Sequence, residues 1–230
     1  MIPAVAVVPA AGRSRRMGRP KLLLPYRGST VVGSLVAALA AGGVGEVVLV
    51  VASDRGSLAR WGRAAGLTVA VNPDPSRGML SSVRVGIAAL GGAVALSPRG
   101  APLLVAPGDL PALRPATVAA LLRSFAATAA PLAVPVHRGR RGHPLLISPR
   151  LIAEIDRLDP AVGLRQLLAR HPGELLRVEV DDPGVLHDVD TSEDYRRLAG
   201  VNPSPLRGRR AGTEGGTDEV GAAPQPRRRG

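Results

Sequence analysis

The sequence lacks cysteine and has few aromatic residues, with one Trp, two Tyr and one Phe. Without cysteine the chain forms no disulfide bond and no thiolate metal site, which is compatible with the reducing cytoplasm where we expect the protein. Because aromatic residues make up only 2% of the chain, Ala, Val, Leu and Ile must fill the core. No apolar run reaches about 18 residues and no basic region precedes the first one, so neither a membrane span nor an export signal is expected.

Acidic residues are also scarce relative to basic ones, and the formal net charge is +12. Such a charge is typical of nucleic-acid-binding proteins. Six of the arginines, however, lie after residue 200, and no aromatic residues alternate with the basic ones to stack on bases. We therefore expect no nucleic-acid partner and no membrane partner, and the positive charge can steer small polyphosphate substrates instead. Residues 201–230 are mainly Gly, Pro and Arg, which predicts a disordered tail after one domain of residues 1–200.

Apolar patterns and turn residues predict alternating strands and helices. Thr30 can cap a helix that ends at Gly42-Gly43, and the β-branched run at 46–53 is typical of a strand buried on both faces. The other expected elements are helices at 54–65, from Gly78, and at 117–127, 149–158 and 163–170, and strands at 67–71, within 102–111 and at 175–180, with a strand, basic turn and strand over 131–148. This order predicts a doubly wound, mostly parallel, Rossmann-like α/β sheet, in which ligands bind at the carboxyl ends of the strands.

The first predicted strand runs into a loop of small and basic residues, AVAVVPAAGRSRRMGRPKLLLP over residues 4–25. Its small residues Ala10, Ala11 and Gly12 let backbone amides approach a ligand. Lys21 is the single lysine of the chain, and its compact ammonium can close around one phosphate oxygen where a wide guanidinium cannot. The pattern indicates phosphate binding; a solvated basic loop, with one lysine placed there by chance, is the alternative.

Two better-known phosphate loops do not fit this stretch. The Walker A motif requires four residues between its glycines and then Lys-Ser/Thr, whereas five residues separate Gly12 from Gly18 and Arg-Pro precedes Lys21. The dinucleotide motif G-x-G-x-x-G is absent as well. The loop is therefore a phosphate site of another kind or no phosphate site.

Two further segments place polar side chains at the same predicted edge of the sheet. The segment PLLVAPGDLP delivers Asp109 at the end of an apolar strand, where its carboxylate can hold Mg²⁺ or can only shape the loop as an Asx-turn. The predicted helix that opens near Gly78 carries Ser81 and Ser82 in its first turn. These hydroxyls can face the ligand, or they can merely cap the helix.

The last acidic segment, VLHDVDTSEDYRRL, precedes a predicted helix capped by Thr191 or Ser192. Asp188 and Asp190 are expected on one side of a short strand before that cap. Upstream, the segment RGHPLLIS contains His143, which can contact a second substrate or serve the structure only. The other histidines lack the spacing of a metal triad.

Taken together, these segments resemble the MobA-like nucleotidyltransferases, and most closely the molybdenum cofactor cytidylyltransferase branch. The branch typically reads LAAGxSxRMGxxKxLLP, and the residues in step with it are Ala10, Ala11, Gly12, Ser14, Arg16, Met17, Gly18, Lys21, Leu23, Leu24 and Pro25. Its GMSSSLRAGL, GDMP or GDQP, RGHPVLFS and DVDTPEDY segments also have counterparts in the same order. The resemblance covers about residues 4–200 and implies the sheet of nucleotide-diphospho-sugar transferases.

The resemblance also implies roles for individual residues. Arg16 and Lys21 would be catalytic, holding the β- and γ-phosphates and the α-phosphate of the nucleotide. The nucleotide-binding residues would be Ala10, Ala11, Gly12, Ser81, Ser82 and Asp109. Asp109 and Asp190 would hold Mg²⁺, and His143 and Asp188 would lie on the side of the acceptor.

The activity implied by this resemblance is Mg²⁺-dependent transfer of CMP from CTP to the phosphate of molybdopterin, with release of pyrophosphate. CTP is expected rather than GTP, because the guanylyl branch usually carries LAGG where this chain has Ala10-Ala11-Gly12. A molybdoenzyme that receives the product is a further possible partner. Two alternatives stay open: the same fold with a sugar phosphate, methylerythritol phosphate or phospholactate as acceptor, and a non-catalytic carrier or maturation factor for the cofactor.

Overall fold

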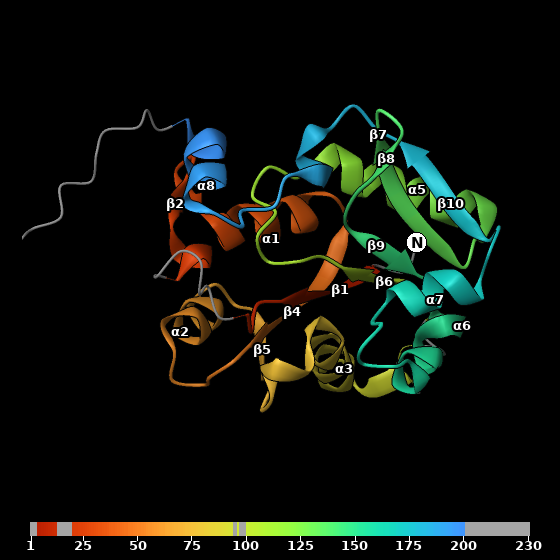
Figure 1. The fold of residues 1–230 in the computed structure, drawn as a ribbon, viewed down its shortest axis with the longest axis horizontal. Helices are drawn as coiled ribbons and strands as arrows, with labels where there is room; N and C mark the ends of the chain where they lie inside the picture. Colours follow the sequence, from red (N-terminus) through yellow and green to blue (C-terminus); the bar gives the residue numbers. More distant parts are fainter. Residues whose placement is uncertain (1–3, 13–19, 94–95, 97–99, 201–230) are drawn as a thin grey trace, which may run out of the picture.

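A computed structural model describes residues 4–12, 20–93, 96 and 100–200 (Figure 1). Arg16 and the predicted tail at 201–230 lie outside these residues. The described strands are β1 (Ala4–Pro9), β2 (Pro25–Tyr26), β3 (Ser29–Thr30), β4 (Val44–Val51), β5 (Thr68–Val71), β6 (Leu103–Val105), β7 (Leu132–His137), β8 (Arg140–Arg141), β9 (Leu145–Ile147) and β10 (Leu175–Glu179). The described α-helices are α1 (Val31–Ala41), α2 (Ser57–Ala64), α3 (Met79–Ala89), α5 (Pro115–Thr128), α6 (Pro149–Ile152), α7 (Arg165–Arg170) and α8 (Ser192–Ala199), and the 3₁₀ helices are η1 (Lys21–Leu23), η2 (Pro75–Arg77), η3 (Ala153–Arg157) and η4 (Pro183–Leu186).

An eight-stranded sheet in the order β10-β7-β9-β6-β1-β4-β5, with β8 paired to β7, forms the centre of the molecule. β1 pairs in parallel with β4 and β6, and β4 with β5, which confirms the predicted mostly parallel sheet. β9 is the exception, since it runs antiparallel to both β6 and β7. The turn between β7 and β8 is too short for the crossover that parallel pairing needs, so the chain reverses there.

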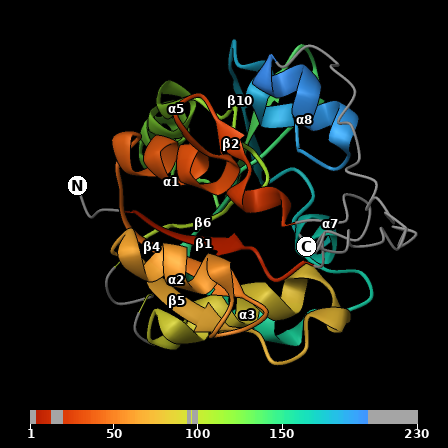
Figure 2. The same ribbon diagram turned by 90° about the vertical axis from the view of Figure 1, so that its left-hand side faces the viewer.

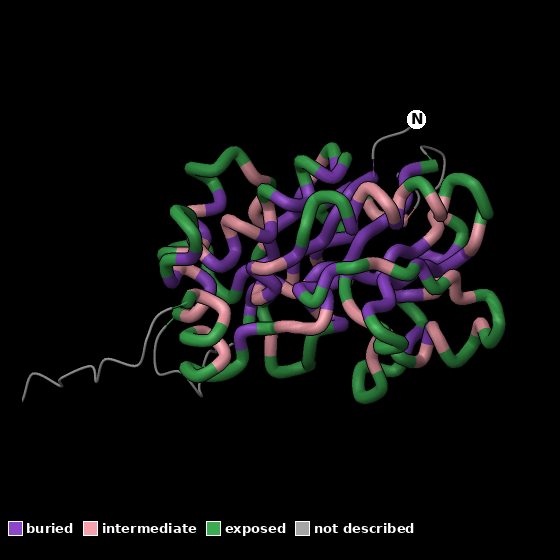
Figure 3. Tube along the Cα trace, turned by 90° about the horizontal axis from the view of Figure 1, so that it is seen from above, coloured by how far each residue is buried: buried purple, intermediate pink, exposed green. Residues whose placement is uncertain are grey.

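Side chains that alternate along β1 fill two separate cores. Ala4, Ala6 and Val8 belong to one buried cluster, and Val5 and Val7 belong to the other. Figure 2 shows α1 and α5 over one face of the sheet and α3 over the other. Buried segments accordingly run through the middle of the molecule and exposed segments lie around its rim (Figure 3). Aliphatic residues supply almost all of this core, as the low aromatic content predicts.

The ends of the helices on these faces follow the local sequence signals. The Thr30 hydroxyl accepts a hydrogen bond from the Gly33 N–H at 3.0 Å and caps α1, as predicted. α3 begins after Gly78, whose φ of 84° suits glycine and few other residues. Ser81 and Ser82 lie inside α3, so the alternative that they cap it is wrong.

Two local predictions need correction. Residues 187–190 form no strand, although Asp188, Val189 and Asp190 keep the alternation of an exposed, a buried and an exposed residue. α2 begins at Ser57 rather than at residue 54. None of the described helices combines the length and the apolar character that crossing a membrane requires.

Candidate active site

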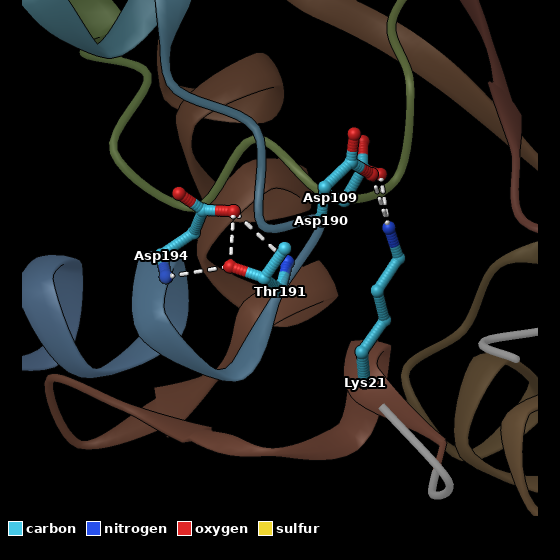
Figure 4. A network of polar contacts seen from close by, with 5 residues as sticks. All are labelled: Lys21, Asp109, Asp190, Thr191 and Asp194. Carbon is cyan, nitrogen blue, oxygen red and sulfur yellow. Dashed lines mark hydrogen bonds and ion pairs between the residues drawn. The ribbon is translucent and has the colours of Figure 1, made fainter. Parts of the chain in front are cut away.

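Three charged side chains from distant parts of the chain meet at the carboxyl edge of the sheet. The Nζ of Lys21, the first residue of η1, donates to Asp109 Oδ2 at 2.7 Å and to Asp190 Oδ1 at 3.1 Å. Figure 4 shows both carboxylates directed at this ammonium. The side chains of Lys21 and Asp109 are 16% and 18% exposed, whereas that of Asp190 is 48% exposed. The cluster is thus anchored inside the protein and open to solvent on one side.

The backbone holds the two carboxylates beside each other independently of the lysine. Asp109 lies in the loop after β6, which is the parallel neighbour of β1. The Val189 N–H donates to the Asp109 carbonyl at 2.9 Å and joins the loop of Asp190 to that of Asp109. Directly after Asp190, Thr191 caps α8 in a reciprocal capping box with Asp194 (Figure 4). These bonds fix where the chain enters and leaves Asp190.

Burial and neighbouring charges together determine the protonation of this cluster. Desolvation acts to lower the pKa of Lys21, but the hydrogen bonds and charges of Asp109 and Asp190 outweigh it, and this pKa lies above its ordinary value. Partial burial, together with the neighbouring carboxylates of Asp190 and Asp109, raises the pKa of Asp188. The Lys21 ammonium is therefore firmly charged.

The donor atoms of the cluster fit a hard divalent cation such as Mg²⁺. Asp109 and Asp190 present carboxylate oxygens, and the ammonium of Lys21 already lies between them as a stand-in cation. Within residues 4–12, 20–93, 96 and 100–200, no three His, Cys, Asp or Glu side chains form a metal cage by themselves. Mg²⁺ commonly binds through one or two carboxylates and completes its coordination with water and substrate phosphates, so two carboxylates suffice.

The small residues after β1 are only partly arranged as the sequence predicts. The Ala10 N–H donates to the Val50 carbonyl at 2.8 Å and extends the pairing of β1 with β4. This corrects the expectation that the Ala10 amide faces a nucleotide. Ala11 is buried and Gly12 is exposed, and both lie at the carboxyl end of β1 beside the loop of Asp109.

The two serines of α3 are tied to an asparagine that no sequence signal singled out. Asn72 is 2% exposed, and its Nδ2 donates to Ser81 Oγ at 2.8 Å and to Ser82 Oγ at 2.9 Å. Ser82 is 4% exposed, so its hydroxyl serves the fold, which corrects its expected place against the nucleotide. Ser81 is more open, and its hydroxyl also donates to the Gly78 carbonyl at 2.7 Å. Asn72 thereby fixes the start of α3 relative to the end of β5.

A pocket of about 840 Å³ adjoins the start of α3. Its walls come from residues 78–80 at the start of α3, from Val105 and Pro107 at the end of β6, from Val134 within β7, and from residues within 141–145 and 160–169. Most of these residues are apolar, while Arg141, His143 and Arg165 supply the ionisable groups. No sequence pattern indicated that residues 160–169 close one side of this pocket.

His143 connects the pocket with the carboxylate cluster. Its N–H donates to the Val185 carbonyl at 2.9 Å, and its ring lines the pocket. Although the residue remains exposed, loss of water around the ring lowers the pKa of His143, while the charges of Asp109 and Asp188 act in the opposite direction. The pocket and the carboxylates of Asp109 and Asp188 are therefore electrostatic neighbours.

Arg84 on α3 joins this helix to the segment that precedes the pocket wall at 160–169. Its guanidinium donates to the carbonyls of Ile155, Asp156 and Leu158 at distances from 2.7 to 3.2 Å. These carbonyls belong to η3 and the residues after it, just before the wall that begins at residue 160. Arg84 thus holds the start of this wall against α3.

The sequence of this chain matches a family model and two curated proteins. The family model described as "MobA-like NTP transferase domain" matches residues 6–175. Nicotine blue oxidoreductase of Paenarthrobacter nicotinovorans is 34% identical over 199 residues, which cover 84% of this chain and 94% of that protein. Molybdenum cofactor cytidylyltransferase of Escherichia coli K12 is 25% identical over 190 residues, which cover 82% of this chain and 92% of the relative.

Solved structures show the same fold. Rv0371c from Mycobacterium tuberculosis H37Rv is 34% identical, with a TM-score of 0.69 over 86% of this chain and 97% of that one. A structure of Rv0371c in complex with manganese has 31% identity and a TM-score of 0.62 over 87% of this chain and 100% of that one. The order of motifs, the sheet and these matches lead to one conclusion: the chain belongs to the MobA-like NTP transferase domain family, a family of nucleotidyltransferases.

Proposed function

We propose that this protein transfers CMP from CTP to the phosphate of a molybdopterin-type cofactor, with Mg²⁺ as the metal ion and pyrophosphate as the second product. The observation that carries the proposal is the position of Lys21 Nζ between Asp109 and Asp190, at the carboxyl edge where β1 and β6 end. The similarity to the cytidylyltransferase of Escherichia coli supports the choice of nucleotide and acceptor. The cytoplasmic location and the order of domains expected from the sequence remain part of this proposal.

Each residue of the cluster has a role that follows from its charge. Asp109 and Asp190 would hold Mg²⁺, which neutralises triphosphate charge when bound. Lys21 would donate to the α-phosphate as negative charge builds there, and Arg16 would hold the β- and γ-phosphates. Ala11 and Gly12 would frame the nucleotide. Transfer of this kind depends on position and charge more than on covalent help from the protein.

The reaction forms one phosphorus–oxygen bond and breaks another. An oxygen of the acceptor phosphate attacks the α-phosphorus, and the bond from that phosphorus to the bridging oxygen breaks, so pyrophosphate leaves with the bond electrons. The pocket beside His143 suits the acceptor, because its apolar walls can hold a flat ring and Arg141 and Arg165 can attract anionic groups. No general base is required, since a phosphate oxygen at neutral pH is already ionised.

Pyrophosphate release with Mg²⁺, CTP and purified molybdopterin tests the proposal, with mass spectrometry of the product. Sugar phosphates, methylerythritol phosphate and phospholactate serve as competing acceptors, and Asp109→Asn serves as the inactive control. CTP should exceed GTP by about ten- to hundredfold in kcat/KM, the range for one mismatched group. That preference rests on the resemblance alone, because Ala11 is 3% exposed and its methyl lies within the protein. Equal use of the two triphosphates would reject the cytidylyl assignment.

The 34% identity to nicotine blue oxidoreductase favours one second candidate, an oxidoreductase that uses the same pocket. Loss of absorbance from a reduced nicotinamide nucleotide, supplied with an aromatic acceptor dye and without CTP, would identify that activity. Pyrophosphate release without such oxidation supports the transferase. Tight retention of molybdopterin with neither reaction would identify a carrier, whose natural partner would be a molybdoenzyme.

A further inference from the structure

We propose that Lys21 is a movable counter-ion that couples metal binding to triphosphate binding. With neither ligand present, its ammonium neutralises Asp109 and Asp190; when both ligands are present, it leaves the carboxylates and turns to a phosphate. This inference rests on the proposed function and specifies how its site is regulated.

The first support is that Lys21 and a divalent cation would compete for the same oxygens. Lys21 Nζ lies 2.7 Å from Asp109 Oδ2 and 3.1 Å from Asp190 Oδ1, so it occupies the position from which a cation contacts both carboxylates. A divalent ion held by these oxygens would lie within a few ångströms of the ammonium and would be repelled by it. Metal binding therefore requires Lys21 to move away.

The second support is that the carboxylates do not need Lys21 to stay together. The bond from the Val189 N–H to the Asp109 carbonyl joins their loops, and the capping box of Thr191 and Asp194 fixes the chain after Asp190. When Lys21 departs, the two carboxylates remain beside each other with uncompensated negative charge. A site of this kind attracts a metal ion as soon as the ammonium is gone.

The third support is the side chain itself. Lysine carries its charge on an unbranched, flexible stem with three rotatable donors, whereas arginine carries a rigid planar fork. Lys21 begins the one-turn helix η1, and its side chain is 16% exposed beside the 48% exposed Asp190, so the cluster is open to solvent on the side of Asp190. A triphosphate arriving at that side offers new oxygens to the ammonium.

These three points predict cooperative binding. Metal alone must displace Lys21 from both carboxylates without offering it a phosphate in their place, so it binds weakly. Metal together with a triphosphate gives Lys21 another anionic partner, so both bind more tightly, and the coupling is reciprocal. Removing the ammonium should therefore tighten the binding of metal alone, an effect opposite to that of removing a metal ligand.

The test measures Mn²⁺ binding by electron paramagnetic resonance of the free ion. Wild-type protein and Lys21→Met are titrated without nucleotide and with α,β-methylene CTP, after correction for Mn²⁺ held by free nucleotide. Lys21→Met should bind Mn²⁺ alone at least about fivefold more tightly than wild type, which is the lower end of typical coupling. The nucleotide should then increase the Mn²⁺ affinity of Lys21→Met by a smaller factor than it increases that of wild type. Asp190→Asn should weaken Mn²⁺ binding under both conditions.

The exposed Arg123 of α5 provides a control for net charge, because Arg123→Met removes one positive charge outside the cluster. Its Mn²⁺ affinity should match that of wild type. Equal or weaker Mn²⁺ binding by folded Lys21→Met would overturn the inference. If Lys21→Met does not fold, independent binding of Mn²⁺ and nucleotide to wild type overturns it instead. Tighter Mn²⁺ binding by Lys21→Met, with no pyrophosphate release by wild type, would support the inference and reject the proposed function.

Discussion

Replacing Lys21 with arginine isolates the shape of the cation, because the charge and both carboxylate partners are kept. A guanidinium can bind a carboxylate through two parallel N–H donors, so Arg at this position should hold Asp109 or Asp190 at least as firmly as Lys does. Loss of one partner is what makes a largely buried ion pair costly, and Lys21→Arg leaves neither carboxylate without a cation, so the melting temperature should change little. The fold should therefore survive this substitution.

Turnover should nevertheless fall. A fork bound to a carboxylate leaves it less readily, and it is too broad to take the position of a single ammonium at a phosphate oxygen. The loss resembles removal of one preorganised donor, which costs about 10²- to 10³-fold in kcat, or roughly 3 to 4 kcal/mol. We expect Lys21→Arg to lose at least about tenfold in kcat, since Arg keeps the charge, and Lys21→Ala to lose at least as much. Steady-state pyrophosphate release with CTP and Mg²⁺ measures both.

The exposed Arg123 on α5 offers a matched control, because Arg123→Lys exchanges the same two residue types away from the cluster. This variant should turn over like wild type. A wild-type kcat in folded Lys21→Arg would refute the reasoning and return Lys21 to an ordinary surface cation.

Four further outcomes can be measured. Asp190→Asn should raise the Mg²⁺ concentration for half-maximal pyrophosphate release at an unchanged melting temperature, and an unshifted Mg²⁺ curve would place the metal elsewhere. Gly86→Ala should lower the free energy of unfolding measured in urea, because the new Cβ would lie 2.5 and 2.6 Å from the Val7 methyls. Overpacking of this kind costs about 1 to 3 kcal/mol, more than the ~1 kcal/mol gained in helix propensity. Adding Val7→Ala, which removes these methyls, should recover part of the lost stability. His171→Gln should lower the melting temperature at about pH 5.5 and not at about pH 9. Hydrogen bonds to Glu174 and Glu154 raise the pKa of His171, so its contribution to stability is present below about pH 6.5 and is lost as the pH rises through its pKa in the folded protein. Equal losses at both pH values would contradict this reasoning. A chain without residues 201–230 should keep its melting temperature and kcat, and a large loss of either would show that the tail packs on the domain.

Local features of the fold could be predicted because their causes are local. The Thr30 cap, the glycines after α1 and the buried run of β4 depend on neighbours within a few residues. The insertion of β9 between β6 and β7 could not be predicted in this way, because it depends on pairing with two strands at once. The sequence of residues 131–148 predicts a chain reversal between two strands. It does not predict which strand of the sheet the chain pairs with after that reversal.

The candidate site likewise combines features that have local causes with features that depend on contacts between distant residues. Lys21 lies 88 residues from Asp109 and 169 from Asp190, so no spacing rule could predict that they meet. The predicted sheet placed Lys21 and Asp109 at one edge, and the resemblance to a family added Asp190. The place of Ser82 could not be predicted from local sequence, because a serine at the start of a helix can face a ligand or accept a hydrogen bond from a buried side chain. In the structure the Nδ2 of buried Asn72 donates to its hydroxyl. The roles of the site residues, the tail and Mg²⁺ stay predictions.

The charge distribution suggests how the substrate arrives. The chain as a whole is basic, yet the described cluster sets three carboxylates, Asp109, Asp188 and Asp190, against the single ammonium of Lys21. Long-range attraction would draw a triphosphate toward the protein, and the three described carboxylates would attract a divalent ion rather than the phosphates themselves. If Lys21 acts as proposed, a triphosphate that carries a divalent ion suits both charges, because the ion would satisfy the carboxylates while Lys21 would turn to the phosphates. The proposal therefore predicts that the metal–nucleotide complex binds more tightly than either ligand alone.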